Sequence, residues 1–356
     1  MHVELAVVGG GPAGGTVAVQ LARRGHSVAL FEAGEYSESR VGETLPPEIN
    51  PLLRQLGLWE VFLESTPLES PGIISFWGST APAELDFIRN PYGSGWHVDR
   101  RRLDACIVDE AERSGVAVRR STRVSAVEKF AAGWRLRTSA GDECTSDVLI
   151  DATGRSGLRI PGVSPRRAID DALVGVWFRF ARENAERDQR ALIESAPDGW
   201  WYSSPLPDGD IVATYITERQ NEMQPAAILA ELTDAPATRA RLGHSTLITA
   251  RVMPVLSSLR EELTGSQWCA VGDAACTYDP LSGLGVLSAM QSARFLVESY
   301  VTGDFVAFQA KVQQSFRNYV SERRKNYGME RRWQDRSFWR GRAASESPSR
   351  SEPTVV

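Results

Sequence analysis

Residues 3–32 limit the possible fold more than any other stretch of the chain. An apolar run, Val3–Val8, precedes Gly9-Gly10-Gly11-Pro12-Ala13-Gly14 and a helical pattern that ends near Leu21. A second apolar run, 27–31, ends at Glu32. This order of strand, glycine turn, helix and strand with a terminal acid is typical of a βαβ dinucleotide-binding unit. The glycines permit a tight turn, close approach to a pyrophosphate and helix packing, and the helix N-terminus favours the phosphates. We therefore expect a dinucleotide at Gly9, Gly11, Gly14 and Glu32.

Composition excludes several classes of protein. The 356 residues are enough for about two domains, and no stretch approaches the roughly 18 apolar residues of a membrane span. The net charge of −5 gives no nucleic-acid footprint, and the four cysteines and four histidines lack the spacing of metal ligands. No secretory signal is visible before the first expected strand. We expect a cytoplasmic protein with no metal, no membrane contact and no nucleic acid.

Two later segments bear on which dinucleotide is bound. Residues 148–157 read as an apolar strand that ends in a turn of small residues. Residues 268–275 form a strand that ends at Asp273, whose carboxylate suits a sugar-chain hydroxyl. The turn 280–285 then opens a helix over 286–300, whose positive N-terminus could face a developing anion such as the edge of a reduced flavin. There is no second GxGxxG, so we expect one bound dinucleotide.

With these motifs the chain resembles the FAD-dependent monooxygenases of the p-hydroxybenzoate hydroxylase and tryptophan halogenase superfamily, over roughly residues 3–340. The segment 40–47 (RVGETLPP) is similar to the loop beside the flavin in the halogenase branch, and 96–104 is similar to a helix start where an arginine lies by the cofactor. The resemblance implies FAD as the cofactor. The residues that it assigns to FAD are Gly9, Gly11, Pro12, Ala13, Gly14, Glu32, Ala33, Arg40, Gly42, Thr44, Arg100, Val124, Asp273, Pro280, Gly283, Leu284 and Gly285.

The halogenase branch itself is disfavoured. Halogenases of this superfamily use a lysine in the strand after the flavin loop, here 72–77, yet residues 1–128 contain no lysine. Ser282 replaces the glutamate of the tryptophan halogenases, and the WxWxIP signature is missing. The chain looks closest to the LodB-like flavoproteins, which mature tryptophylquinone cofactors. The matching residues include 199–207, 278–282 and a tail motif of Tyr327, Glu330, Arg332, Trp333, Phe338, Trp339 and Arg340.

The expected fold class is α/β. We expect a Rossmann-like FAD-binding domain of the glutathione-reductase-2 type over 1–72, 97–168 and 252–304. It would be interleaved with an antiparallel β-sheet substrate domain over 73–96 and 169–251. Alternating aromatic strands in the second set of residues support such a sheet. C-terminal helices are expected over 305–342, and the polar residues 343–356 read as a disordered tail.

The implied activity is hydroxylation of an electron-rich aromatic ring through a C4a-hydroperoxyflavin. The LodB-like resemblance favours a tryptophan side chain of a partner protein during cysteine tryptophylquinone biogenesis. A hydroxylase of a small aromatic or natural product, and a non-catalytic FAD-bound assembly factor, remain as alternatives. Electrons would come from reduced nicotinamide or a separate flavin reductase, and O2 would be the co-substrate. The candidate catalytic residues are Glu43, Trp201, Tyr202, Pro280 and Ser282.

Several prominent residues have a plainer interpretation. We expect Trp177, Trp200 and Tyr215 to pack in the core rather than touch substrate, His97 to be structural, and Cys276 to be a small buried residue. Residues 317–342 carry nine basic and three acidic side chains. Such an excess is usually a solvated helix face, and its alternative is a docking surface for an acidic, tryptophan-containing partner.

Overall fold

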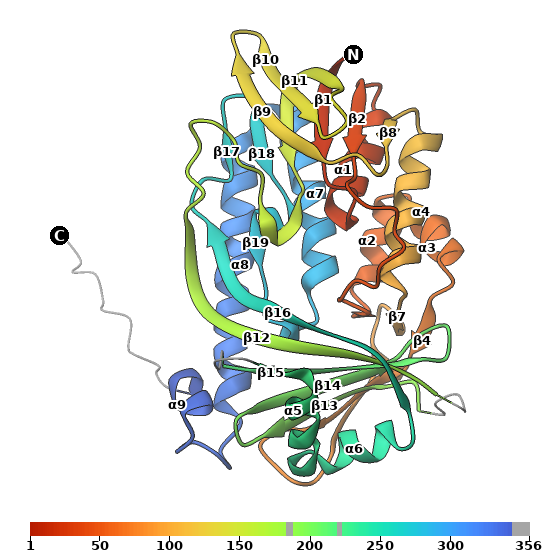
Figure 1. Cartoon of the computed structure of the whole chain (residues 1–356), viewed down its shortest axis with the longest axis vertical. Helices are drawn as coiled ribbons and strands as arrows, with labels where there is room; N and C mark the ends of the chain where they lie inside the picture. Colours follow the sequence, from red (N-terminus) through yellow and green to blue (C-terminus); the bar gives the residue numbers. More distant parts are fainter. Residues whose placement is uncertain (183–187, 219–222, 344–356) are drawn as a thin grey trace, which may run out of the picture.

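A computed structural model describes residues 1–182, 188–218 and 223–343 of the chain. Its upper half in Figure 1 is built on a mixed sheet with the strand order β17-β18-β11-β1-β2-β8. Four neighbouring pairs in this order, from β18 to β8, are parallel, as in dinucleotide-binding folds. The strands are β1 (His2–Val8), β2 (Val28–Phe31), β8 (Ala117–Arg119), β11 (Glu143–Asp151), β17 (Thr264–Gly265) and β18 (Trp268–Ala270). The antiparallel strands β9 (Val124–Phe130) and β10 (Gly133–Thr138) extend it from β11.

Three helices cover this sheet: α1 (Pro12–Ala22), α4 (Arg100–Arg113) and α7 (Gly285–Thr302). Of these, α1 packs against both α4 and α7. The helix α1 is buried over ten of its eleven residues. This explains its continuous run of small and apolar residues, because a helix hidden on all sides has no polar face to maintain. Proline stands at its first turn, where the missing N–H costs nothing.

The lower half is an antiparallel-rich sheet with the order β19-β16-β12-β15-β14-β13-β5-β6 (Figure 1). Its two longest strands, β12 (Arg167–Ala181) and β16 (Thr246–Arg260), pair along their length and curve from the first sheet to the far end of the second. The other strands are β5 (Gly72–Phe76), β6 (Ala83–Asp86), β13 (Ala191–Ala196), β14 (Gly199–Pro205), β15 (Ile211–Thr217) and β19 (Cys276–Thr277). Helices α5 (Pro225–Ala230) and α6 (Pro236–Leu242) cover its outer face.

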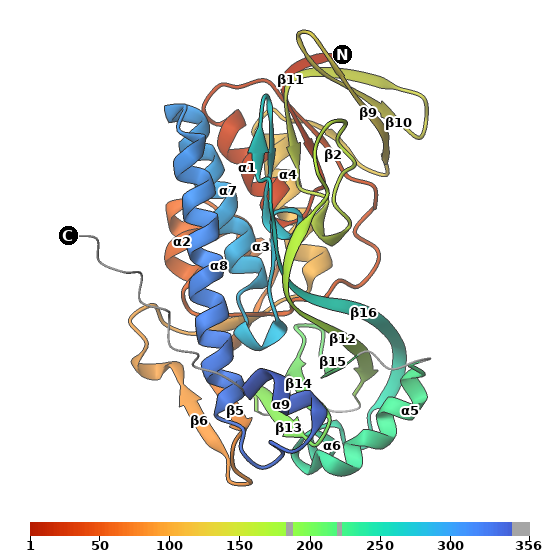
Figure 2. The same cartoon turned by 90° about the vertical axis from the view of Figure 1, so that its left-hand side faces the viewer.

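Smaller elements join the two halves. A three-stranded sheet holds β3 (Thr44–Leu45), β7 (Gly95–His97) and β4 (Leu68–Ser70), beside α2 (Ile49–Gln55) and α3 (Trp59–Glu64). Figure 2 shows α8 (Phe305–Gly328) running down the molecule from the first sheet to the second, where α9 (Ser337–Ala343) follows it. None of the helices in the described residues is long and apolar enough to span a membrane.

The expected fold class is confirmed: an α/β unit with the parallel strands of a dinucleotide-binding fold carries an antiparallel sheet and a helical C-terminal segment. The exact limits of the two units stay a prediction, because β12 and β16 run without interruption from one to the other. Of the expected disordered tail, Ala343 ends α9 and the rest lies outside the described residues.

Candidate functional site

The glycine turn between β1 and α1 has the geometry of a phosphate site. Gly9 has φ +109°, and a Cβ there would lie 2.2 Å from the carbonyl oxygen of Ala152. A Cβ on Gly14 would lie 1.9 Å from the carbonyl oxygen of Gly9, whereas one on Gly11 would meet no protein atom within 4 Å. Gly9 and Gly14 are therefore required by the fold, while Gly11 borders open space. No side chain caps α1, so its N-terminal N–H groups can bind an anion.

Glu32 directly follows β2 beside this turn and is 7% exposed. Its Oε2 accepts the Gly10 N–H at 2.7 Å, and its Oε1 accepts the Gly34 N–H at 2.9 Å. A carboxylate has about four lone-pair sites, so capacity remains for a ribose hydroxyl. Of the other residues assigned to this end of the cofactor, Ala33 is exposed and Val124 starts β9.

A charged cluster holds the loop that follows. Asp104, with no exposed side-chain surface, accepts hydrogen bonds from Arg40 at 3.1 Å and from two nitrogens of Arg100 at 3.1 Å. Arg40 also bridges to Glu32 at 2.9 Å, and Arg100 Nη1 donates to the Val41 carbonyl at 2.6 Å. Two arginines thus balance two acids, and the network joins β2, α4 and residues 40–42.

Glu43 is the buried acid of this loop, 5% exposed. It accepts hydrogen bonds from the Trp177 indole at 2.7 Å and from the Gly42 N–H at 2.9 Å. Burial raises the pKa of Glu43 above its usual value, although both hydrogen bonds favour the charged form. Trp177, which the sequence suggested was a packing residue, therefore also touches the site. Trp177 is the eleventh residue of the strand β12, and its position in an alternating strand carried no signal of that partner.

A second chain of hydrogen bonds ties the same loop to β14. Tyr202 Oη contacts Thr44 Oγ1 through a short hydrogen bond and lies 2.8 Å from Ser204 Oγ. Thr44 Oγ1 lies 2.8 Å from His97 Nδ1, and His97 Nε2 lies 2.6 Å from the Gln189 carbonyl. A carbonyl only accepts, so Nε2 carries the proton and Nδ1 of the neutral ring accepts from Thr44. Burial lowers the pKa of His97 to about 4, which keeps the ring neutral.

Trp201 does not share the face of Tyr202. Neighbouring residues of a strand point to opposite sides, and Trp201 packs with Phe178 and Tyr215 on the face covered by α5 and α6. Tyr202 and Trp200 lie on the other face, toward the loop at Val41 and the C-terminal segment. Trp201 and Tyr202, both candidate catalytic residues, therefore lie on opposite faces of the sheet, as strand alternation indicates. That either of them touches substrate stays a prediction.

The turn assigned to the flavin edge lies at the start of α7. Gly283 has φ +62°, and a Cβ on Gly283 or Gly285 would meet no protein atom within 4 Å. No side chain caps α7, which leaves its first N–H groups free. The Ser282 hydroxyl donates to the Asp279 carbonyl at 2.8 Å and accepts from the Leu284 N–H at 3.3 Å. Ser282 therefore closes this turn, and its hydroxyl is already engaged there. Pro280 begins the 3-10 turn that Ser282 ends.

Asp273 stands in the turn after β18, and its carboxylate lies 3.2 Å from Arg155 Nε. The N–H of the preceding residue, Gly272, donates to Ser292 Oγ of α7 at 2.9 Å. A Cβ on Gly272 would lie 2.8 Å from Ala13 Cβ, so the turn packs directly on α1. There is open space at Gly11, Gly283 and Gly285, two helices start without a side-chain cap, and the acids Glu32 and Asp273 stand beside these turns. These features fit an elongated anionic dinucleotide such as FAD.

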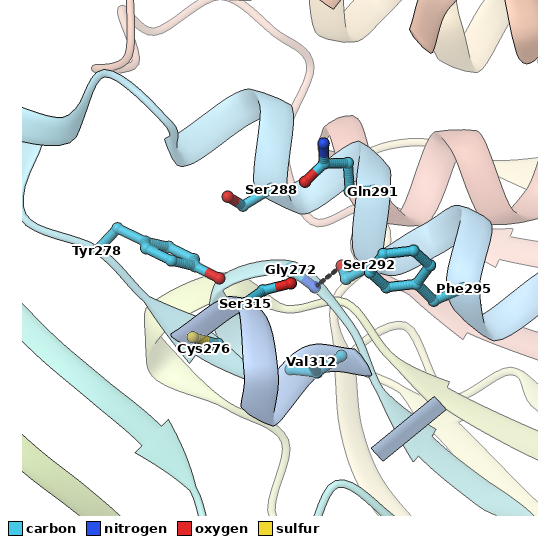
Figure 3. Close-up of a pocket in the computed structure, with 9 residues that line it drawn as sticks. All are labelled: Gly272, Cys276, Tyr278, Ser288, Gln291, Ser292, Phe295, Val312 and Ser315. Carbon is cyan, nitrogen blue, oxygen red and sulfur yellow. Dashed lines mark hydrogen bonds between the residues drawn. The ribbon is translucent and has the colours of Figure 1, made fainter. Parts of the chain in front are cut away.

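Behind Gly272, a small cavity of about 10 Å³ lies between α7 and α8 (Figure 3). This volume suits about one water molecule, and serine hydroxyls from both helices, Ser288, Ser292 and Ser315, border it. Cys276 lines the same cavity, and burial raises the pKa of its thiol to about 12. A thiol with such a pKa stays protonated at neutral pH, which agrees with the plain interpretation of this cysteine.

Comparisons with known proteins agree with this site. Residues 2–160 match the FAD binding domain family. The chain is 28% identical to the FAD-dependent oxidoreductase LodB of Marinomonas mediterranea, covering 95% of this chain and 96% of LodB. It is 27% identical to a tryptophan 2-halogenase of Chondromyces crocatus, covering 85% of this chain but 62% of the halogenase. The chain thus spans nearly all of LodB and less than two thirds of this halogenase.

Solved structures show the same fold. The myxobacterial chondrochloren halogenase CndH superposes with a TM-score of 0.87 at 25% identity, covering 98% of this chain and 87% of CndH. The peptidyl tryptophan dihydroxylase QhpG, essential for tryptophylquinone cofactor biogenesis, superposes with a TM-score of 0.78 at 24% identity, covering 100% of this chain and 81% of QhpG. Fold and site together define an FAD-dependent oxidoreductase. Within that class, the protein resembles LodB and the flavin-dependent halogenases, which confirms the resemblance drawn from the motifs.

The basic C-terminal segment is less available than its charge count suggested. Arg323 is 7% exposed, and Arg332 and Arg342 are partly buried. All three pair with acids of the protein itself: Arg323 with Asp170, Asp171 and Asp279, Arg332 with Glu330, and Arg342 with Asp171 and Glu218. Three of the nine basic side chains thus point inward and hold the segment to the sheet, and docking of a partner on 317–342 stays a prediction.

Proposed function

We propose that this protein is an FAD-dependent monooxygenase that hydroxylates an electron-rich aromatic ring, and that its substrate is a tryptophan side chain of a partner polypeptide. The observation that carries the proposal is the junction of the flavin-side loop with the inner face of the sheet. Glu43 and Thr44 of the loop are hydrogen-bonded to Trp177 and Tyr202 of the sheet. An aromatic wall is thereby fixed against the place where the flavin edge is expected.

Bound FAD would supply two electrons that activate O2. One oxygen atom would then enter a ring C–H bond, and the other would leave as water with two protons. The protein's part is to orient the ring and to exclude water. Trp177 and Tyr202 provide apolar surface whose polar atoms are already paired, so they do not compete for the substrate. The uncapped start of α7 offers N–H groups to negative charge on the reduced flavin.

Two comparisons support the choice of substrate class. LodB is matched over almost its entire length, and QhpG, which shares the fold, acts on a peptidyl tryptophan. The missing lysine in residues 1–128 argues against halogenation, since the strand after the flavin loop offers no side chain to carry an oxidised halide.

The experiment uses full-length protein loaded with FAD, a flavin reductase with NADH, and isotopically labelled O2. The probes are a tryptophan-containing peptide, free tryptophan and indole, each with and without bromide. We expect labelled oxygen in the peptide, read by tandem mass spectrometry at the tryptophan. Label in the free compounds alone would favour a small-molecule hydroxylase. Bromine incorporation, or quantitative hydrogen peroxide with every probe, would overturn the proposal.

Glu43→Gln separates catalysis from assembly. A non-catalytic FAD-bound assembly factor would tolerate this change for as long as FAD stays bound. A monooxygenase with Glu43 at its site would lose oxygen transfer while FAD binding persists.

A further inference from the structure

Two segments that the sequence marked separately meet at one buried carboxylate. Asp279, which begins the turn at the flavin edge, is 1% exposed. Its Oδ2 accepts hydrogen bonds from Tyr327 Oη at 2.8 Å and from Arg323 Nε at 3.3 Å. Its Oδ1 accepts the N–H of Leu281 at 2.9 Å, and its own N–H donates to Tyr319 Oη at 2.7 Å. The helix α8 thus contacts this turn through hydrogen bonds of three side chains, Tyr319, Arg323 and Tyr327.

The charge balance at this carboxylate depends on Arg323. Burial raises the pKa of Asp279, and the guanidinium beside it opposes that shift. The remaining nitrogens of Arg323 pair with Asp170 at 2.5 Å and with Asp171, both on β12. One guanidinium therefore connects the turn to β12, one of the two longest strands of the second sheet. Removing one partner of such a buried pair leaves an uncompensated charge.

Tyr327 connects the turn to β14. Its hydroxyl donates to Asp279 and accepts the indole N–H of Trp200 at 3.0 Å. Tyr327 is 1% exposed, and Trp200 is fully buried on the same face of the sheet as Tyr202. The tyrosine hydroxyl thus uses both its donor and its acceptor capacity, so its position fixes the Asp279 carboxylate relative to the sheet. A merely space-filling residue would need neither partner.

We propose that Tyr327 and Arg323 of the C-terminal helix are positioning residues for the flavin-facing turn: by holding Asp279 they set where Pro280–Gly285 and the start of α7 lie against FAD. Tyr327, the first residue of the tail motif, would then connect the cofactor turn to the sheet. This inference needs only FAD binding and is independent of the substrate.

The test compares Tyr327→Phe with Tyr215→Phe. Tyr215 is also a buried tyrosine of this sheet, 2% exposed, but it lies on the opposite face. The readouts are the FAD dissociation constant, the midpoint potential of the bound flavin, and the melting temperature of the FAD-free protein. We expect Tyr327→Phe to weaken FAD binding about tenfold and to shift the potential, as for loss of a hydrogen bond to a charged group. Tyr215→Phe should change the melting temperature alone.

A double-mutant cycle shows whether Tyr327 acts through Asp279. In an Asp279→Asn background, Tyr327→Phe should have a much smaller effect on FAD binding than in the natural protein. Equal effects in both backgrounds would overturn the proposal, as would equal changes in FAD affinity from Tyr327→Phe and Tyr215→Phe. Arg323→Lys is a second probe, since it keeps the charge and loses the geometry. If Arg323→Lys left the FAD dissociation constant and the flavin midpoint potential unchanged, Arg323 would not be a positioning residue.

Discussion

The indole nitrogen of Trp177 donates a 2.7 Å hydrogen bond to a carboxylate oxygen of Glu43, and both side chains are buried. One residue lies in the second sheet and the other in the flavin-side loop. This bond therefore fixes the loop to the wall opposite it. It is also one of the side-chain hydrogen bonds that the buried Glu43 carboxylate accepts, so loss of this bond should alter the position of Glu43 at the site.

Trp177→Phe keeps most of the buried surface and removes the donor. We expect weaker FAD binding and an altered flavin absorption spectrum, with a stability loss of about 1.5–3 kcal/mol for a hydrogen bond to a charged group. The control is Trp134→Phe, since Trp134 is also buried and donates to the Gln267 carbonyl at 2.6 Å, away from the site. It should lose stability with unchanged FAD binding. Identical FAD titrations of the two variants would contradict the role given to Trp177.

Glu43→Gln should change how stability depends on pH. Because burial raises the pKa of Glu43 in the folded state, the unfolded chain loses this proton first as the pH rises above 4.5. The natural protein should therefore lose stability relative to Glu43→Gln from that pH upward, until the folded carboxyl has also ionised. Urea unfolding of both proteins from pH 4 to pH 8 measures the difference. A difference that stays constant with pH would show that Glu43 does not titrate abnormally.

His97 should have a pH signature of the opposite sign. Its pKa is lowered from 6.5 to about 4 in the folded protein. Between these two pH values the histidine is therefore protonated in the unfolded chain but neutral in the folded protein. Stability should fall as the pH drops from 6.5 toward 4, by roughly 3 kcal/mol at most. In His97→Gln this part of the acid sensitivity should vanish. Parallel unfolding curves for the two proteins across this window would refute the neutral, buried state of His97.

Two glycines of the first turn should respond differently to alanine. Gly11→Ala places its methyl group in open space, so the apo protein should fold and FAD should bind at least tenfold more weakly, about 1.4 kcal/mol. Gly14→Ala places its methyl group 1.9 Å from the Gly9 carbonyl oxygen, so folding itself should suffer. Circular dichroism and FAD titration distinguish the two effects. Normal FAD binding by Gly11→Ala would mean that the pyrophosphate lies elsewhere.

The sequence predicted local features well and distant partnerships poorly. The unit from β1 through α1 to Glu32 is specified by neighbouring residues, so pattern alone was enough. The face occupied by Trp201 follows from strand alternation, which predicts that it differs from that of Tyr202. The bond between Glu43 and Trp177 joins residues 134 positions apart, and no local pattern reports it.

The directions of the charged side chains in 317–342 could not be predicted, for a related reason. The excess of basic residues in 317–342 was correct as a count, but a count does not show direction. Arg323 and Arg342 face acids on β12 because the C-terminal segment lies along the second sheet, and that placement is a property of the whole fold. Asp279 and Tyr327 were each recognised within a motif, while their contact became visible only in three dimensions.

Pairing between strands far apart in the sequence also limits how early each sheet can be completed during synthesis. During synthesis β5 cannot pair with β13, and β11 cannot pair with β18, until the later strand of each pair has left the ribosome. The glycine turn emerges first and the Asp279 turn among the last. Neither half can complete its sheet early, so a nascent chain carries unpaired strand edges for most of its synthesis, and its solubility during that interval depends on how quickly the last third arrives.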